Sequence, residues 1–395
     1  MSNQQLTRQR IQSVDVLRGI VMVIMALDHT RDFFHVTAVT DQPTNMATTW
    51  PVLFFTRWIT HFCAPTFVFL SGTAAFLHGQ KKTTAQLSNF LLKRGVWLIA
   101  VEIIVMTMAL TFNPLYNLIF FEVIWAIGIS MVLLALLIHL PFRALFAIGL
   151  MIFFLHNLLD YPEAARMGKL NILWGIIHGR NTVIPLNASH IILVGYSFLP
   201  WTGIMILGYC CGKLFTPAID PLFRRKILLR TGFGLISLFI ALRFINVYGD
   251  PFPWTIQKNN ITSFLSFMNA NKYPPSLIFS SMTLGPSLIT LALVENIQNK
   301  LTRFVTVYGR VPLFYFVLHF FLIHIICVIL FFASGHSMSE AFSAQSPLGF
   351  RPAQFGYPLW IVYLIWIFVV LAMYPLCKKY NRYKSTHSHW WLSYL

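Results

Sequence analysis

The chain has 395 residues, of which 57% are hydrophobic and only 10% are charged. Soluble domains usually carry about 25% charged residues, so the composition excludes a soluble protein and indicates one that crosses a membrane several times. The formal net charge of +17 does not indicate a nucleic-acid partner, because the basic residues recur in short clusters between apolar runs, as orientation signals do.

About ten stretches of the chain are apolar and long enough to cross a membrane, for which about 20 residues are needed. In chain order they are expected at residues 14–35, 52–77, 94–112, 118–139, 142–159, 191–214, 227–247, 276–295, 305–333 and 358–377. The polar stretches between them are too short to form a separate domain. The sequence therefore predicts an all-α polytopic membrane protein with residues 1–395 in a single bundle.

Basic residues between the predicted spans indicate the orientation. With the amino terminus inside, the inside segments hold 18 lysine and arginine residues and the outside segments hold 7. Because cytoplasmic loops are enriched in basic residues, both termini are predicted to lie in the cytoplasm. The first span is expected to remain uncleaved, since Asp15 and Arg18 interrupt its apolar run and no small-residue cleavage site follows.

Ionisable residues gather at the outer end of the first span: Asp28, His29, Arg31, Asp32 and His35. Steps of three and four residues return to one side of a helix, so Asp28, Asp32 and His35 are expected to share a face. Ionisable groups at membrane depth mark functional sites by default. We therefore take this cluster as the candidate catalytic site.

The chemistry predicted for the cluster is general base catalysis by a histidine that a carboxylate orients. Either His29 or His35 would take a proton from an attacking amine or hydroxyl, and Asp28 or Asp32 would fix the tautomer of the ring. A nucleophilic imidazole that carries the acyl group is the alternative. The spacing leaves the choice between the two histidines open.

Further ionisable groups are predicted inside other spans. They are Arg57 and His61 in the second, Glu102 in the third, Glu122 at the start of the fourth, and Arg310, His319 and His324 in the ninth. Buried charges need partners, and pairs between either glutamate and Arg57 or Arg310 would satisfy them and hold the bundle together. The five cysteines form no CxxC pair, so neither a disulfide framework nor a metal site is predicted.

Three stretches of the chain resemble a known family. The opening SVDVLRGIVMVIMALDH, the second-span FCAPTFVFLSG and the later YGRVPLFYFVLH are similar to the heparan-alpha-glucosaminide N-acetyltransferase family and its bacterial relatives, over about residues 10–380. In that family a histidine in the outer segment after the first helix is catalytic. Here the resemblance points to His35 or His29, although the family's His-Ala-x-Trp-Asn-Gly context is missing after His35.

The resemblance implies a transmembrane acyltransferase, with acetyl-CoA from the cytoplasm as co-substrate and a sugar or another polar acceptor on the outer side. The residues expected to bind the CoA thioester are Arg18, Lys93, Arg94, Arg310 and His319. Those expected to bind the acceptor are Arg31, Arg57, His61 and Glu122. Basic side chains suit CoA phosphates because their hydrogen bonds are charge-assisted, although the positive-inside rule alone also explains the basic inner loops.

The bacterial relatives suggest an inner (plasma) membrane, with membrane lipids as neighbours and no nucleic-acid partner; a homodimer is left open. The alternative from another functional class is a proton-coupled transporter or exporter of a small polar or envelope precursor molecule. Buried chains of acids and histidines also serve proton transport, and a transporter of that kind would need no acyl donor.

Overall fold

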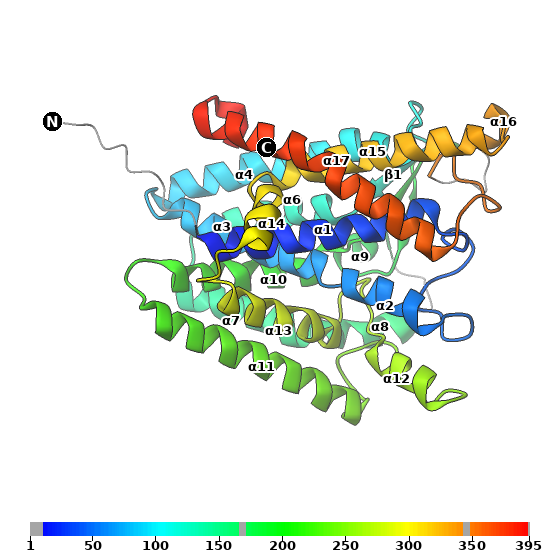
Figure 1. Ribbon diagram of the computed structural model, residues 1–395. Coiled ribbons are helices and arrows are strands. Elements are labelled where there is room, and N and C mark those ends of the chain that lie inside the picture. The colour runs from blue at the N-terminus through cyan, green and yellow to red at the C-terminus, as the bar shows by residue number, and fades with distance from the viewer. Residues whose placement is uncertain (1–10, 166–170, 343–347, 394–395) are drawn as a thin grey trace.

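The computed structural model describes residues 11–165, 171–342 and 348–393 (Figure 1). Its helices are α1 (Gln12–Phe34), α2 (Pro51–Thr60), α3 (Cys63–Gly79), α4 (Thr84–Ala100), α5 (Thr107–Thr111), α6 (Val123–Leu137), α7 (Phe142–Leu155), α8 (Asp160–Ala165), α9 (Ile172–Ile177), α10 (Phe198–Cys211), α11 (Pro221–Ile245), α12 (Asn260–Met268), α13 (Leu277–Leu293), α14 (Lys300–Arg310), α15 (Pro312–Ala333), α16 (Met338–Ala341) and α17 (Leu359–Thr386). The strands are β1 (Leu118–Phe121), β2 (Thr182–Pro185) and β3 (Ile191–Val194).

The predicted all-α polytopic membrane fold is confirmed. Within the described residues, seven helical stretches are long and apolar enough to cross a membrane, and α6 and α13 are shorter apolar helices. α1 also crosses the bundle, but its charged residues set it apart from these apolar helices. The total of about ten spans and the orientation stay predictions.

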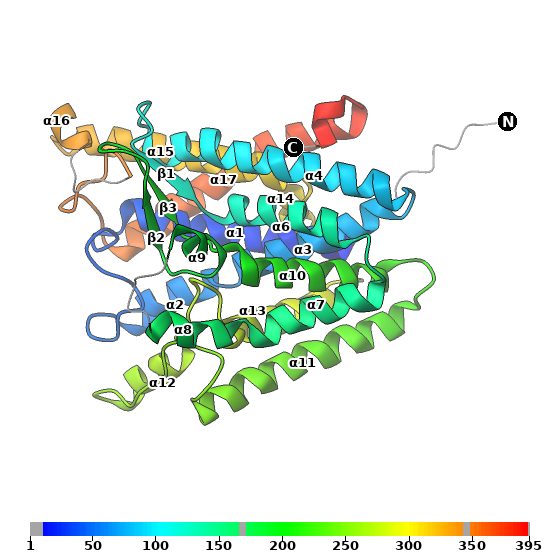
Figure 2. The ribbon, with the colours of Figure 1, turned by 180° about the vertical axis from the view of Figure 1, so that it is seen from behind.

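Two of the predicted spans begin in strands rather than in helices. The stretch 118–139 starts with β1 and the stretch 191–214 starts with β3, and these strands pair in parallel with Leu118 opposite Ile191. β2 pairs with β3 in antiparallel orientation and completes the sheet (Figure 2). A run of four to eight apolar residues has no periodicity that separates a buried strand from a helix, which is why the sequence prediction was wrong here.

The predicted ninth span, 305–333, is two helices. α14 ends at Arg310, and α15 starts with Pro312 at its first position. Proline suits the first turn of a helix, where its missing N–H has no helical partner to lose, and it cannot continue a preceding helix. The second predicted span is also two helices, α2 and α3, which meet at His61 and Phe62, but here no proline occupies the first position of the second helix.

The long connections gather at one end of the bundle. α2, α8, α12, α16 and the three strands lie at that end, whereas α1 begins and α17 ends at the opposite end (Figures 1 and 2). This arrangement agrees with two termini on the same side of the membrane. The ionisable end of α1 therefore lies among the long connections.

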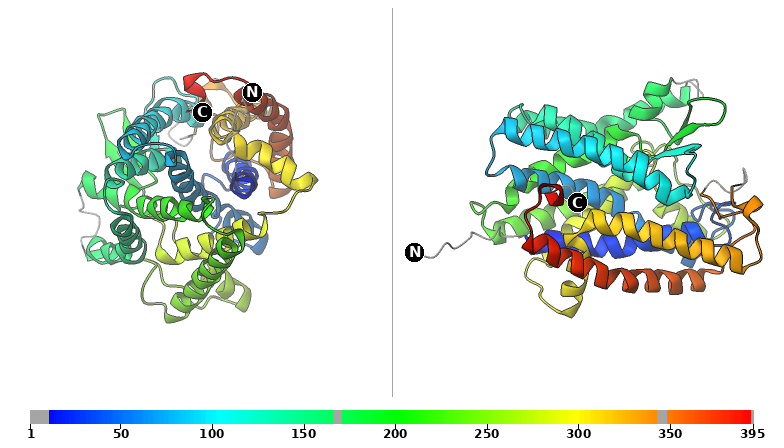
Figure 3. Two further views of the ribbon diagram at one scale, coloured as in Figure 1. Left: turned by 90° about the vertical axis from the view of Figure 1, so that its left-hand side faces the viewer. Right: turned by 90° about the horizontal axis from the view of Figure 1, so that it is seen from above.

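α1 lies inside the bundle and packs against α14, α15 and α17 (Figure 3, left). Its closest approach is to α14, where Gly19 faces the backbone of Val305 and Gly309 faces the backbone of Asp15. A Cβ atom at either glycine would overlap these backbone atoms, so small residues let the two helices touch. The contact brings Arg18 to the carbonyl oxygen of Gly309, to which its Nη1 donates over 3.0 Å.

Candidate active site

Asp28 is the centre of a buried ion network between α1 and α2. It accepts hydrogen bonds from Arg31 Nη2 over 3.0 Å and from Arg57 Nη1. Arg31 also donates to Asp32 over 2.6 Å. The network leaves neither arginine with an uncompensated charge, as burial requires. The predicted pairing of Arg57 with a glutamate is therefore wrong, because Arg57 pairs with Asp28.

The other predicted partner, Arg310, lies 3.7 Å from Asp15 at the opposite end of α1, and its side chain is 41% exposed. The buried Glu102 instead accepts backbone N–H groups of Glu122 over 3.3 Å and of Trp125 over 3.0 Å. These groups begin α6, where a carboxylate is favoured by the positive end of the helix dipole. Glu102 lies in a π-helical turn, Val101–Met106, between α4 and α5, and such turns are frequent at functional sites.

His29 pairs with a histidine from α15 rather than with a carboxylate of its own helix. Its Nδ1 lies 2.7 Å from Nε2 of His319, and its ring stacks on Phe320 with centroids 4.0 Å apart. His319 Nδ1 lies 3.0 Å from the carbonyl oxygen of Tyr315. The predicted contact between His29 and Asp32 is not among the hydrogen bonds of the described residues.

The hydrogen-bond chain assigns the protons of both rings. A carbonyl oxygen only accepts, so His319 carries its proton on Nδ1 and accepts at Nε2. His29 must then donate from Nδ1, which leaves Nε2 as its basic nitrogen. The His29 side chain is partly exposed, and 42% of the Asp32 side chain one turn further on is also exposed.

His35 has a different environment in the loop after α1. It is 2% exposed, its Nδ1 lies 3.0 Å from the hydroxyl oxygen of Thr37, and its carbonyl oxygen accepts from Arg351 over 2.5 Å. The backbone of the same residue forms a β-bridge with Tyr357. His35 thus joins the loop to the segment before α17. Burial first, and then the charges of Arg31 and Arg351, lower its pKa to about 4.

We expect His35→Asn to flatten the dependence of stability on pH. The folded-state pKa of His35 lies below its usual value near 6.5, so between about pH 4 and 6.5 the unfolded chain binds more protons and stability falls as pH falls. The variant removes this group and keeps a side-chain acceptor near the Thr37 hydroxyl. Melting temperatures of both proteins from pH 7.5 to 4.5 test this, and parallel curves would contradict it.

Several residues beside the ion network were not predicted. Tyr273 lies 3.4 Å from Arg57 Nη2 through its hydroxyl group. The buried Lys272 places Nζ 5.0 Å from the Tyr273 ring and 5.7 Å from the Tyr196 ring. These residues come from loops whose sequence carries no motif, so only the fold brings them to α1. Lys272 adds a third positive charge beside the two arginines.

The predicted acceptor residues do not all lie together. Arg31 and Arg57 belong to the ion network. His61, one turn beyond Arg57, is buried, and its Nδ1 makes no hydrogen bond to any described residue. Glu122 lies against Gly195, between β3 and α10. The contact is close, since a Cβ atom added at Gly195 would lie only 2.6 Å from Glu122 Oε1. Glu122 therefore approaches the site from the end of the sheet.

A cavity opens on the other side of the histidine pair, between α1, α3, α4, α6 and α15. Its volume is about 80 Å³, and Arg18, Ser71, Arg94 and Phe316 are among its lining residues. We call it the arginine cavity. The Phe316 ring also contacts both histidine rings, with centroids 6.0 Å from that of His29 and 5.8 Å from that of His319. One aromatic side chain thus lines the cavity and touches the pair.

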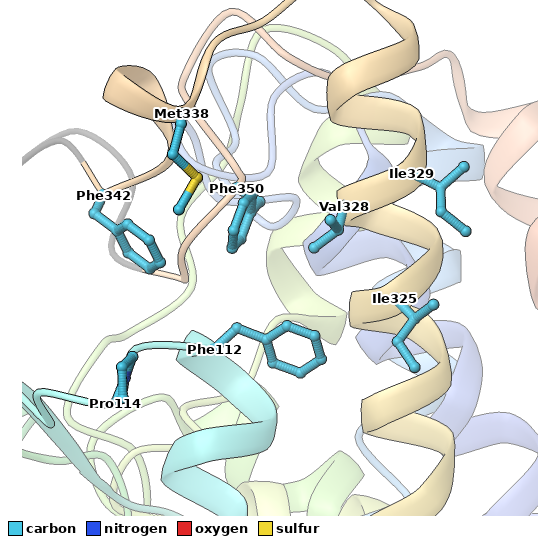
Figure 4. Close-up of a pocket in the computed structure, with 8 residues that line it drawn as sticks. All are labelled: Phe112, Pro114, Ile325, Val328, Ile329, Met338, Phe342 and Phe350. Atoms are coloured by element: carbon cyan, nitrogen blue, oxygen red, sulfur yellow. The ribbon is translucent and has the colours of Figure 1, made fainter.

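The five residues predicted to bind CoA do not lie at one site in the structure. Arg18 and Arg94 line the arginine cavity together. His319 lies at the histidine pair, while Lys93 and Arg310 are exposed and do not line the cavity. A second pocket beside α15 is lined by eight apolar residues, including Phe112 and Phe350 (Figure 4). It offers no titratable group, so it is not a candidate catalytic site.

Comparison with known families gives one match. A family model described as heparan-alpha-glucosaminide N-acetyltransferase, catalytic, matches residues 10–245, which is more than half of the chain and runs through α11. The match includes His29 and the ion network, and it ends before His319 and Lys272. A search of curated proteins found no match.

Proposed function

The chain belongs to the heparan-alpha-glucosaminide N-acetyltransferase family and is a membrane acetyltransferase, and on that premise we propose that acetyl-CoA is its donor and His29 its general base. The donor would bind in the arginine cavity, and a polar acceptor would approach from the end of α1 at Asp32. Because the family is one of enzymes, the alternative of a transporter without chemistry is set aside.

The observation that carries the proposal is the hydrogen-bond chain from the Tyr315 carbonyl through His319 to His29. It holds the His29 ring in one tautomer, with Nε2 free to accept a proton. In many enzymes a carboxylate fixes the tautomer of the base; here a neutral histidine does so. The nearby carboxylate, Asp28, is bound to two arginines and is a positioning residue for the site.

The reaction needs one proton transfer in each direction. As the acceptor amine or hydroxyl attacks the thioester carbonyl, His29 Nε2 takes the proton that the nucleophile loses, and the carbon–sulfur bond breaks to release the CoA thiolate. The resulting imidazolium then returns this proton to the thiolate. His319 Nε2 stabilises the charged ring by accepting its Nδ1–H, which is a stronger hydrogen bond once the donor is charged.

The arginine cavity supports the donor side of the proposal. Arg18 and Arg94 lie towards the end of the bundle where α1 begins and α17 ends, and they suit phosphate groups because guanidinium groups donate charge-assisted hydrogen bonds. The apolar lining beyond them suits the less polar arm that carries the thioester. Phe316, at the far end, would bring the thioester carbonyl to the histidine pair.

The polar groups at the other end of α1 support the acceptor side. Asp32 is the most exposed member of the ion network, and carboxylates accept hydrogen bonds from hydroxyl and ammonium groups. Arg57 and Lys272 both contact Tyr273, and their positive charges act on the Asp32 carboxylate. We place this end of α1 outside a bacterial inner membrane, and a sugar or another envelope molecule with an amine or hydroxyl group as the acceptor.

We expect Arg94→Gln to raise the KM for acetyl-CoA by about 10–100-fold with a smaller effect on kcat. A hydrogen bond to a charged group contributes about 1.5–3 kcal/mol, and every 1.4 kcal/mol is tenfold in affinity. Initial rates of CoA release at varied acetyl-CoA concentration measure the effect. The matched control is Arg143→Gln, since Arg143 is exposed at the start of α7, away from the cavity. Equal KM values for both variants would contradict donor binding in the cavity.

The function itself is tested with purified protein and acetyl-CoA. Acetyl-CoA should raise the melting temperature, and release of free CoA thiol should depend on an added amine or hydroxyl acceptor from a panel of aminosugars and neutral sugars. Neither stabilisation nor thiol release with any acceptor would contradict the assignment of acetyl-CoA as donor.

A further inference from the structure

A second group of ionisable residues lies around α8 and α9, away from the candidate active site. One carboxylate oxygen each of Asp160 and Glu163 and one ring nitrogen of His178 all lie within 4.8 Å of one another. His178 is fully buried and Asp160 is 9% exposed, and 12% of the Glu163 side chain is exposed. Two oxygen ligands and one nitrogen ligand are thus held together out of contact with most solvent.

His178 is oriented by a second buried histidine. Its Nδ1 lies 3.3 Å from Glu163 Oε2, and its Nε2 lies 3.3 Å from Nδ1 of His156, which is 5% exposed. A histidine that binds a metal usually donates its other ring N–H to a neighbouring acceptor, which fixes the tautomer. Because a carboxylate only accepts, His178 donates its Nδ1–H to Glu163 in this structure, and its Nε2 accepts from His156. On metal binding the ring would change tautomer, so that Nε2–H is donated to His156 and the Nδ1 lone pair faces the ion.

The charges of this group are poorly compensated. Arg180 lies 3.6 Å from Asp160 and 3.5 Å from Glu163, farther than in a charge-assisted hydrogen bond of about 2.7–2.9 Å. Asn157 Nδ2 donates to Asp160 Oδ2 over 2.7 Å, but Asp160 Oδ1 and Arg180 Nε are buried and make no hydrogen bond within the described part of the chain. The guanidinium group of Arg180 also lies over the Phe252 ring, 5.0 Å from its centroid. This cation–π contact could hold the Arg180 side chain if it moved away from the two carboxylates.

We propose that Asp160, Glu163 and His178 bind a divalent transition-metal ion, with Zn²⁺ as the best match. Zinc takes histidine nitrogen and carboxylate oxygen ligands at about 2.0–2.2 Å, so loading would draw the three side chains inward from their present spacing. In the absence of a metal ion, Arg180 supplies the positive charge beside the two carboxylates. Metal binding would shift Arg180 towards Phe252.

The ion would link α8 to the segment between α9 and β2. Asp160 and Glu163 belong to α8, and His178 immediately precedes the turn into β2. β2 pairs with β3, and β3 pairs with β1, the strand that leads to Glu122. A metal at this point would therefore stabilise the sheet that ends beside the candidate active site.

The experiment uses untagged full-length protein with His387→Gln and His389→Gln, because these exposed histidines near the carboxyl end bind metals adventitiously. After dialysis, elemental analysis should find about one zinc per chain, and added Zn²⁺ should raise the melting temperature of chelator-treated protein. Glu163→Gln and His178→Asn should each lose the bound zinc and the thermal shift. His190→Asn, in the turn between β2 and β3, is the matched control and should keep both.

Two further variants act in opposite directions and separate a metal site from a structural network. Arg180→Gln should lower the melting temperature of metal-free protein and tighten Zn²⁺ binding, because it removes the competing charge. His156→Phe should weaken Zn²⁺ binding by about 10–100-fold, as loss of such an outer partner does. Zinc that persists in both Glu163→Gln and His178→Asn, or Arg180→Gln protein that binds zinc more weakly, would overturn the proposal.

Discussion

His29→Gln is expected to lower kcat for acetyl transfer by about 10²–10⁴-fold, the usual contribution of a positioned general base, while the protein stays folded. Glutamine is similar in size and keeps an N–H group that reaches His319 Nε2, but its side chain takes up no proton at neutral pH. The measurement is the initial rate of CoA release at saturating acetyl-CoA and acceptor, for proteins with equal melting temperatures.

Two other histidines serve as controls for this effect. His35→Asn should leave kcat within a few-fold of wild type, because His35 holds a loop and its ring bonds to Thr37. His319→Leu removes the acceptor for His29 Nδ1–H, so it should lower kcat by less than His29→Gln and shift the pH profile of kcat. Near wild-type activity in His29→Gln would show that the pair only stabilises the fold.

Asp28→Leu is expected to reduce stability by about 3–5 kcal/mol, the effect of leaving a buried charge without its partner. Among the described residues, the one hydrogen-bond partner that Arg57 then keeps is the hydroxyl group of Tyr273, at 3.4 Å. Arg31 is less affected, since it also pairs with Asp32. Chemical denaturation in detergent measures the loss, with activity at matched folded fraction as a second readout.

Arg57→Met should reduce the free energy of unfolding by less than Asp28→Leu does. The variant that carries both substitutions should be more stable than Asp28→Leu alone. Arg57→Met leaves Asp28 bound to Arg31 at 3.0 Å, so no charge is left alone. Asp28→Leu combined with Arg57→Met removes both members of a buried pair, which is often neutral or stabilising. A double variant as unstable as the sum of the two single variants would contradict a direct interaction between these side chains.

Much of the fold could be predicted from the sequence, because membrane spans are recognised by length and composition. The failures occurred where that signal is ambiguous. The strands Leu118–Phe121 and Ile191–Val194 look like the beginnings of apolar spans, and only their pairing with each other distinguishes them. The helix break before Pro312 could have been suspected from the proline itself. It was not predicted, because Pro312 lies inside a long apolar run.

The candidate site was predictable to the extent that its residues are neighbours in the sequence. Asp28, His29 and Asp32 stand out because ionisable residues are rare in an apolar helix. The residue that orients His29 could not be found in that way, because His319 is 290 positions away and one histidine in an apolar helix has many uses. Arg57 was paired with the wrong acid because spacing along the chain does not show which helices touch.

The most direct test of the account is chemical rescue of a His29→Gly variant, in which the loss of the ring leaves space beside His319 and Phe320. If the His29 ring takes the proton, imidazole should restore acetyl transfer in a saturable manner, and more basic substituted imidazoles should restore it faster. His35→Gly protein should be insensitive to imidazole. Failure of every imidazole to restore activity in folded His29→Gly protein that still binds acetyl-CoA would contradict the account.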